Sequence, residues 1–210
     1  TVVIATFDHP VLDFLDIEGV NISYFVETGF NVLGKSPVQN AHFSSLDTSS
    51  MDVIMGLDIG FRDATAAVVV AYDYDSSTYY VVDEYQNSER TTEAHAIEIK
   101  RLMDKWDVDF AFIDSAAQQT KYDLAMLYDI STTNAKKSLL DGIGFLESLF
   151  DNDRIKVSGN CKDTIYAIDQ YQWDQRPGLV KEKPVHGDAS HLADSLRYAI
   201  YSFQTSFSGV

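Results

Sequence analysis

The sequence predicts an α/β protein in which a mixed sheet, made of an antiparallel three-strand meander plus parallel strands, is flanked by helices. Two observations lead to this class. Three apolar, β-branched runs follow one another with short turns between them, as in a meander. An amphipathic helix pattern then leads to a fourth apolar run, and such a crossover returns the chain parallel to the sheet.

The strands of the meander are expected at 53–59 (VIMGLDI), 64–75 (ATAAVVVAYDYD) and 79–86 (YYVVDEYQ), with DSST as the second turn. A helix is expected at 91–107, because a threonine and a glutamate mark its start and apolar residues recur at helical spacing. The run VDFAFID predicts a short strand at 108–114. The later elements are helices at 118–128, 135–150, 163–173 and 188–203, and a Pro/Gly hairpin or loop at 176–185.

Composition limits the classes of function. The net charge of −16 argues against a passive nucleic-acid coat, which needs clustered Lys and Arg. It leaves room for an enzyme that grips phosphate through bound cations. The longest apolar run, 64–72, is too short to span a bilayer, so we expect no membrane partner. The single cysteine, Cys161, cannot form an internal disulfide and fits a reducing compartment.

Residues 1–50 are expected to form a linker or tail, separate from the domain at 51–210, because their apolar pieces are short and end in the polar stretch SSLDTSS. The chain starts with Thr1, which suggests a fragment of a longer protein. The segment 29–36 (GFNVLGKS) matches the phosphate-binding loop motif, but Pro37 follows it where that loop needs a helix. We therefore interpret it as a match without the necessary structural context.

Two of the predicted strands end in an acid, Asp58 in LDIG and Asp114 in FIDS. These strands are expected to be neighbours, which would bring the two carboxylates together at one edge of the sheet. Carboxylates at that distance repel unless one is protonated or a cation lies between them. Oxygen ligands without cysteine favour a hard cation such as Mg²⁺ or Mn²⁺.

The last helix adds His191 and Asp194, which lie on one helix face because they are three residues apart. Asp194 is expected to be the third carboxylate, and His191 a fourth ligand or a base. Alternatively, His191 and Asp188 only cap and solvate the start of a surface helix. Asp63 and Asp188 are secondary candidates, for a second metal or for ordinary turn and capping positions.

Four segments, GLDIGFRDATAA, FIDSAA, NAKKSLLDGIGFL and SHLADSLRY, make residues 51–206 resemble the C-terminal nuclease domain of the large terminase subunit of tailed bacteriophages. The resemblance implies a ribonuclease-H-like fold and a DNA endonuclease that cuts concatemeric viral DNA during genome packaging. It implies that Asp58, Asp114 and Asp194 are catalytic residues that bind two divalent cations, Mg or Mn, with His191 as an accessory metal ligand. Residues 1–50 would then be the tail of a preceding ATPase domain.

The same resemblance implies several partners: double-stranded DNA, the ATPase motor domain of the same polypeptide, the small terminase subunit and the portal protein. It also implies that the protein acts in the cytoplasm of the infected bacterial host. The expected phosphate contacts are Lys136 and Lys137, with 176–183 (RPGLVKEK) as a mobile flap, although these cations can equally be ordinary solvated charges.

Three other classes stay open from the sequence. A Holliday-junction resolvase or transposase-type nuclease would share the three acids. An actin-like or sugar-kinase-like ATPase also uses an Asp-x-Gly strand end, but this chain is short for two lobes and lacks a second phosphate loop. A non-catalytic interaction module would keep the fold and bind no metal.

Overall fold

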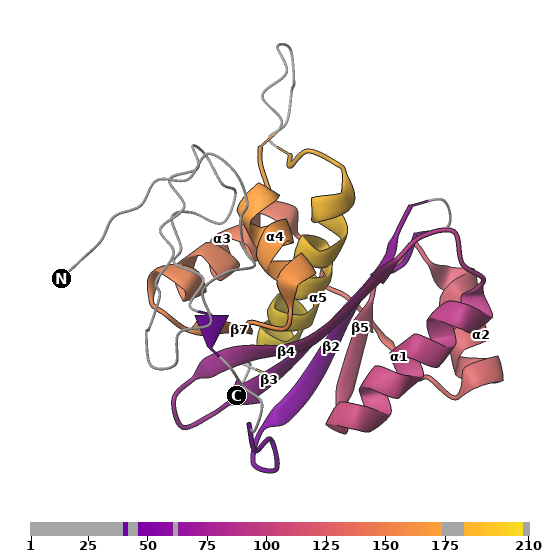
Figure 1. Ribbon diagram of the computed structural model, residues 1–210, viewed down its shortest axis with the longest axis horizontal. Helices are drawn as coiled ribbons and strands as arrows, with labels where there is room; N and C mark the ends of the chain where they lie inside the picture. The colour runs from indigo at the N-terminus through magenta and orange to yellow at the C-terminus, as the bar shows by residue number, and fades with distance from the viewer. Residues whose placement is uncertain (1–39, 42–45, 61–62, 174–182, 208–210) are drawn as a thin grey trace, which may run out of the picture.

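A computed structural model describes residues 40–41, 46–60, 63–173 and 183–207 (Figure 1). Its strands form one seven-stranded sheet in the order β1-β7-β4-β3-β2-β5-β6. The α/β class and the mixed sheet predicted from the sequence are both confirmed.

The centre of the sheet is the predicted meander. β2 (Asp52–Asp58) pairs antiparallel with β3 (Thr65–Asp73), which pairs antiparallel with β4 (Thr78–Asn87). β5 (Phe110–Ile113) lies parallel to β2, with Leu57 opposite Ile113. The predicted neighbourhood of the two acid-ended strands is therefore confirmed.

The sheet extends further than the sequence predicted. β7 (Ile155–Ser158) pairs parallel with β4 in a region that was not assigned a strand. β1 (Asn40–Ala41) and β6 (Thr133–Asn134) add two-residue edges. β7 has only four residues and lies between two helices, so its pattern is too short to be distinguished from a loop.

Helices cover both faces of the sheet. Figure 1 shows α1 (Thr92–Trp106) and α2 (Gln118–Tyr128) on one face, with α3 (Leu139–Asp151), α4 (Lys162–Gln170) and α5 (Asp188–Phe207) on the other. α1 begins as predicted, because the Thr91 side chain accepts a hydrogen bond from the Ala94 amide at 3.2 Å. Each face buries its own apolar cluster against the sheet.

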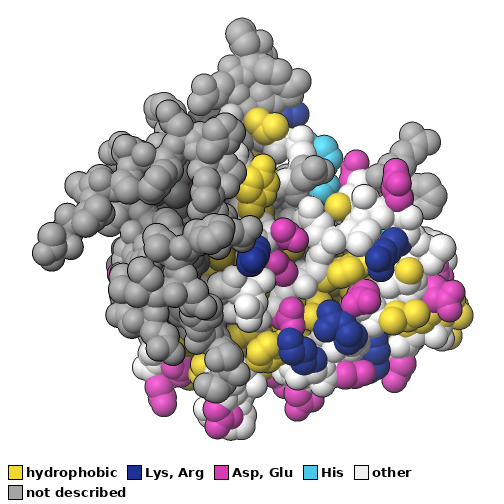
Figure 2. Space-filling model, in the orientation of Figure 1, with side chains coloured by type: hydrophobic (Ala, Val, Ile, Leu, Met, Phe, Trp, Pro, Cys, Tyr) yellow, Lys and Arg dark blue, Asp and Glu magenta, His cyan; other side chains and the backbone are white. Residues whose placement is uncertain are grey.

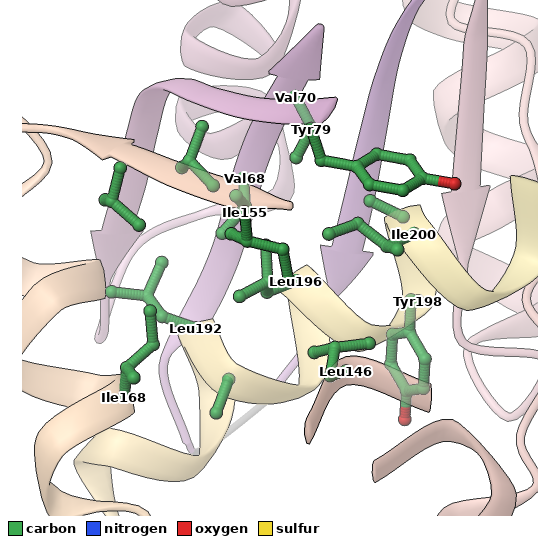
Figure 3. Close-up of a cluster of buried hydrophobic side chains, with 14 of the residues drawn as sticks. Val68, Val70, Tyr79, Leu146, Ile155, Ile168, Leu192, Leu196, Tyr198 and Ile200 are labelled. Carbon is green, nitrogen blue, oxygen red and sulfur yellow. The ribbon is translucent and has the colours of Figure 1, made fainter. Parts of the chain in front are cut away.

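Helix α5 lies directly against the middle strands. Figure 3 shows Leu192, Leu196 and Ile200 on the side of α5 that faces the sheet, near Val68 and Ile155. The approach is close at Gly56 of β2, where an added Cβ atom would come within 1.8 Å of the Ser195 carbonyl oxygen. A glycine at this point is what allows the helix backbone to reach the strand.

Several sequence predictions lie outside the described residues. They are the motif at 29–36, most of the expected tail at 1–50, and most of the proposed flap at 176–183. Within the part of the chain that the structure describes, no helix combines the length and the apolar character that a membrane span requires.

Candidate functional site

The first two acids lie at adjacent strand ends. Asp58 is the last residue of β2, and Asp114 directly follows β5. Parallel pairing joins the two ends, because the Asp114 amide donates a hydrogen bond to the Leu57 carbonyl at 3.2 Å. The register of the sheet thus brings the two acids to the same end of two neighbouring strands, as predicted.

The third acid and the histidine come from the first two turns of α5. Leu192 and Leu196 pack this helix on the sheet, which brings His191 to the end of β2. His191 is almost fully buried, and its Nδ1 atom lies 2.9 Å from Oδ2 of Asp58. This geometry favours a site residue over the alternative that His191 only solvates the start of a surface helix.

Electrostatics also place the three acids in one neighbourhood. Burial raises the pKa of the Asp58 carboxyl, the His191 hydrogen bond opposes that rise, and the charges of Asp194 and Asp114 add to it. The hydrogen bond to Asp58 raises the pKa of His191, with further help from the Asp58, Asp63 and Asp194 charges. A divalent cation at this edge would relieve the repulsion among the carboxylates.

Each acid also accepts hydrogen bonds from a partner of its own. Asp114 Oδ1 contacts Lys137 Nζ at 2.5 Å and the Ala116 amide at 2.8 Å. Asp194 Oδ1 accepts hydrogen bonds from Tyr171 Oη at 3.0 Å and from Arg197 Nη2 at 2.8 Å. Among the described contacts, each carboxylate therefore has a basic partner: His191 for Asp58, Lys137 for Asp114 and Arg197 for Asp194.

The residue types fit a hard divalent cation, because the site offers carboxylate oxygens and one imidazole, while Cys161 is buried elsewhere beneath β4. Among the described residues, no three His, Cys, Asp or Glu side chains already form a metal-holding group. Cation binding would therefore require at least one carboxylate to turn away from its present partner. Asp114 can do so most simply, because its Lys137 partner is a long, half-exposed side chain.

The secondary candidates lie further out. Asp63 is exposed and faces His186, with 3.6 Å between Oδ2 and Nε2. His186 and His191 both line a pocket of about 630 Å³ at the ends of β3 and β4. The side chain of Asp188 is not among those described. Sequence analysis did not single out Tyr171 or Arg197. Lys137, which was predicted to contact phosphate, pairs with Asp114 in this structure. The one available signal was the spacing of Asp194 and Arg197, which is that of a helical ion pair.

The fold is shared with known nuclease domains. The structure is similar to the P22 large terminase nuclease domain, with a TM-score of 0.63 and 20% identity over 78% of this chain and 86% of that one. It is also similar to the g2p nuclease domain of bacteriophage SPP1, solved with bound Mn, with a TM-score of 0.62 and 18% identity over 82% of this chain and 99% of that one. The fold is therefore that of the ribonuclease-H-like terminase nucleases.

Sequence comparison is more specific. The family model for the terminase RNaseH-like domain matches residues 55–203. The large terminase subunit of Escherichia phage T5 is 45% identical over 159 residues, which are 74% of this chain and 36% of that protein. This chain belongs to the terminase RNaseH-like domain family. It spans about a third of the length of this curated relative, and the match gives no support to the ATPase alternative.

Proposed function

We propose that this chain is a metal-dependent endonuclease domain that cuts concatemeric viral DNA during genome packaging. The observation that carries the proposal is the 2.9 Å contact between the buried His191 and Asp58, together with the charges of Asp194 and Asp114 that act on the Asp58 carboxyl. Family membership supports a nuclease, and the bound Mn of the SPP1 relative supports a divalent cation.

Each residue has a role that follows from its position. Asp58, Asp114 and Asp194 would hold two divalent cations, Mg or Mn, and His191 would fix the Asp58 carboxylate or add a ligand. The cations would supply Lewis-acid activation of water and neutralise the charge that develops on the phosphate. Lys137, once it leaves Asp114, is long enough to reach a DNA phosphate. No residue of the chain is required as a covalent nucleophile.

The setting of the reaction is part of the proposal. Residues 1–50 would be the tail of an ATPase domain in the same polypeptide. The partners would be double-stranded DNA, the small terminase subunit and the portal protein, in the cytoplasm of the infected host. On the face drawn in Figure 2, the described Lys and Arg side chains lie among acidic ones and form no continuous basic surface. The remainder of the assembly would therefore supply most of the grip on DNA.

Nicking of a supercoiled plasmid with Mn²⁺ tests the proposal. Asp58→Asn and Asp194→Asn should lower the rate roughly a hundredfold or more, because each removes a charged ligand. Asp104→Asn is the control, since that exposed acid on α1 pairs with Lys100 away from the candidate site and should leave the rate within a few fold. Full activity in either of the first two variants would refute the mechanism. Cleavage confined to four-way junctions would indicate a resolvase instead.

A further inference from the structure

Arg197 is a buried cation that the proposed cleavage mechanism does not use. It lies on α5, one turn beyond Asp194, and only 4% of its surface is exposed. Burying a guanidinium is costly unless its donors are paired. Within the described part of the chain its Nε and Nη1 atoms have no hydrogen-bond partner. Hydrogen bonds from the described residues therefore do not pair all the guanidinium donors, and other contacts hold this side chain in the core.

The surroundings of Arg197 fix its direction. The guanidinium carbon lies 4.7 Å from the centre of the Tyr198 ring, a cation–π contact. On α3, Gly142 provides the space for the arginine stem, because a Cβ atom there would come within 2.9 Å of the Arg197 Cδ atom. With the stem confined by α3, the guanidinium can reach Asp194.

Its charged partner is Asp194. Arg197 Nη2 donates to Oδ1 of Asp194 at 2.8 Å, and Tyr171 Oη donates to the same oxygen at 3.0 Å. Tyr171 is itself almost fully buried at the end of α4. Both hydrogen bonds that Asp194 accepts from described side chains therefore go to Oδ1, and the carboxylate is held from the core side. This arrangement leaves Oδ2 as the oxygen for a ligand.

We propose that Arg197 and Tyr171 are positioning residues that hold the Asp194 carboxylate in the orientation that binds a divalent cation. This inference rests on the proposed function and names the chain's own groups that prepare one ligand of the site. Both residues are buried, so they would act through Asp194 and not by touching the DNA or the reacting atoms. A carboxylate fixed by hydrogen bonds loses less freedom when it binds a cation, so its support contributes to affinity.

Calorimetric titration of the chain with Mn²⁺ in the absence of DNA tests the inference without any cleavage. Arg197→Met keeps the length and the apolar stem but removes the charge, and we expect its Mn²⁺ affinity to fall by about tenfold. Arg197→Lys keeps the charge and should recover part of that loss. Tyr171→Phe removes only a hydroxyl and should weaken binding by a smaller factor.

Two comparisons separate positioning from general damage to the fold. Ile200→Val removes a buried methylene group from the same helix without touching Asp194, so it lowers the stability of the fold. This variant should bind Mn²⁺ like the unaltered chain even if its melting temperature falls as much as that of Arg197→Met. If Arg197→Met does not fold, Tyr171→Phe carries the same test. Unchanged affinity in the folded Arg197 and Tyr171 variants would overturn the inference alone. Absence of Mn²⁺ binding by the unaltered chain would overturn the inference together with the proposed function.

Discussion

The Nδ1 atom of His191 lies 2.9 Å from Oδ2 of Asp58, although 133 positions separate the two residues in the sequence. The contact joins the end of a central strand to the first turn of the last helix. It depends on two local features, Gly56 beneath the helix and the apolar side of α5. The geometry of the candidate site is therefore set by how closely α5 approaches β2.

We expect His191 to affect the affinity for the cation more than the rate of the chemical step. If it supports Asp58 or adds a ligand, His191→Ala should raise the Mn²⁺ concentration needed for half-maximal nicking by about tenfold. A large excess of Mn²⁺ should then restore most of the maximal rate. His186→Ala is the control, because that exposed histidine has no contact with Asp58 among the described interactions. A loss of maximal rate that excess Mn²⁺ does not restore would instead assign His191 to proton transfer.

Gly56→Ala should be strongly destabilising. Its Cβ atom would lie 1.8 Å from the Ser195 carbonyl oxygen and 2.8 Å from the Ala199 amide, both backbone atoms that can move only with the whole helix. We expect the free energy of unfolding to fall by about 3 kcal/mol or more in urea titrations. Gly144→Ala is the matched control in α3, because nothing lies within 4 Å of its Cβ position. That change should stabilise the domain by about 0.5–1 kcal/mol. Equal stabilities of the two variants would contradict the close approach.

Glu84 of β4 caps helix α4 from outside the helix. Its carboxylate accepts hydrogen bonds from the Asp163 amide at 3.0 Å and the Thr164 amide at 2.6 Å, and Cys161 at the N-cap provides no side-chain cap. Glu84→Ala should lower the free energy of unfolding by about 1–2 kcal/mol, because two helix-end donors lose their acceptor. Glu98→Ala, which removes only an exposed ion pair with Arg101, should cost about 0.5 kcal/mol or less. The prediction is wrong if the two variants unfold at the same urea concentration.

His95 should make the stability of the domain depend on pH. Burial, reinforced by the nearby Arg90 charge, lowers the pKa of this ring, which is hydrogen-bonded to Tyr85 at 2.9 Å. In the unfolded chain the histidine pKa is about 6.5, so as the pH falls the unfolded chain binds a proton before the folded chain does. Stability is then lost from about pH 6.5 downward, toward the lower pKa of the folded state, at no more than about 1.4 kcal/mol per pH unit.

Urea titrations at several pH values between 5 and 8 check this slope, an interval chosen to bracket the ordinary histidine pKa of about 6.5. The His95→Gln variant should lose less stability on acidification than the unaltered chain. Identical pH dependence in the two proteins would contradict a lowered pKa for His95.

The sequence was sufficient to predict the central elements and the neighbourhood of the two acid-ended strands. β2, β3 and β4 are apolar-rich runs, and α1 carries both a cap and helical spacing, so local pattern and final structure agree. Asp58 and Asp114 could be brought together in advance because a parallel crossover makes the ends of their strands neighbours.

The supporting contacts could not be predicted in the same way. The Glu84 cap on α4 and the Tyr171 contact with Asp194 join residues that are 80 and 23 positions apart, and both depend on how helices pack rather than on a local pattern. β7 is paired with β4 only in the tertiary structure. Lys137 was selected for its charge, but its partner depends on which anion is nearest to it in the fold.

Helix α5 links the candidate site to the apolar core of the domain. The helix that carries His191 and Asp194 also places Leu196, Ala199 and Ile200 in the core with no exposed surface. Opening of α5 would therefore expose the apolar cluster that fills this face of the sheet, so partial melting of the site alone is disfavoured. The geometry of the candidate ligands therefore depends on the cooperative fold. We expect nuclease activity and folded structure to be lost at the same denaturant concentration.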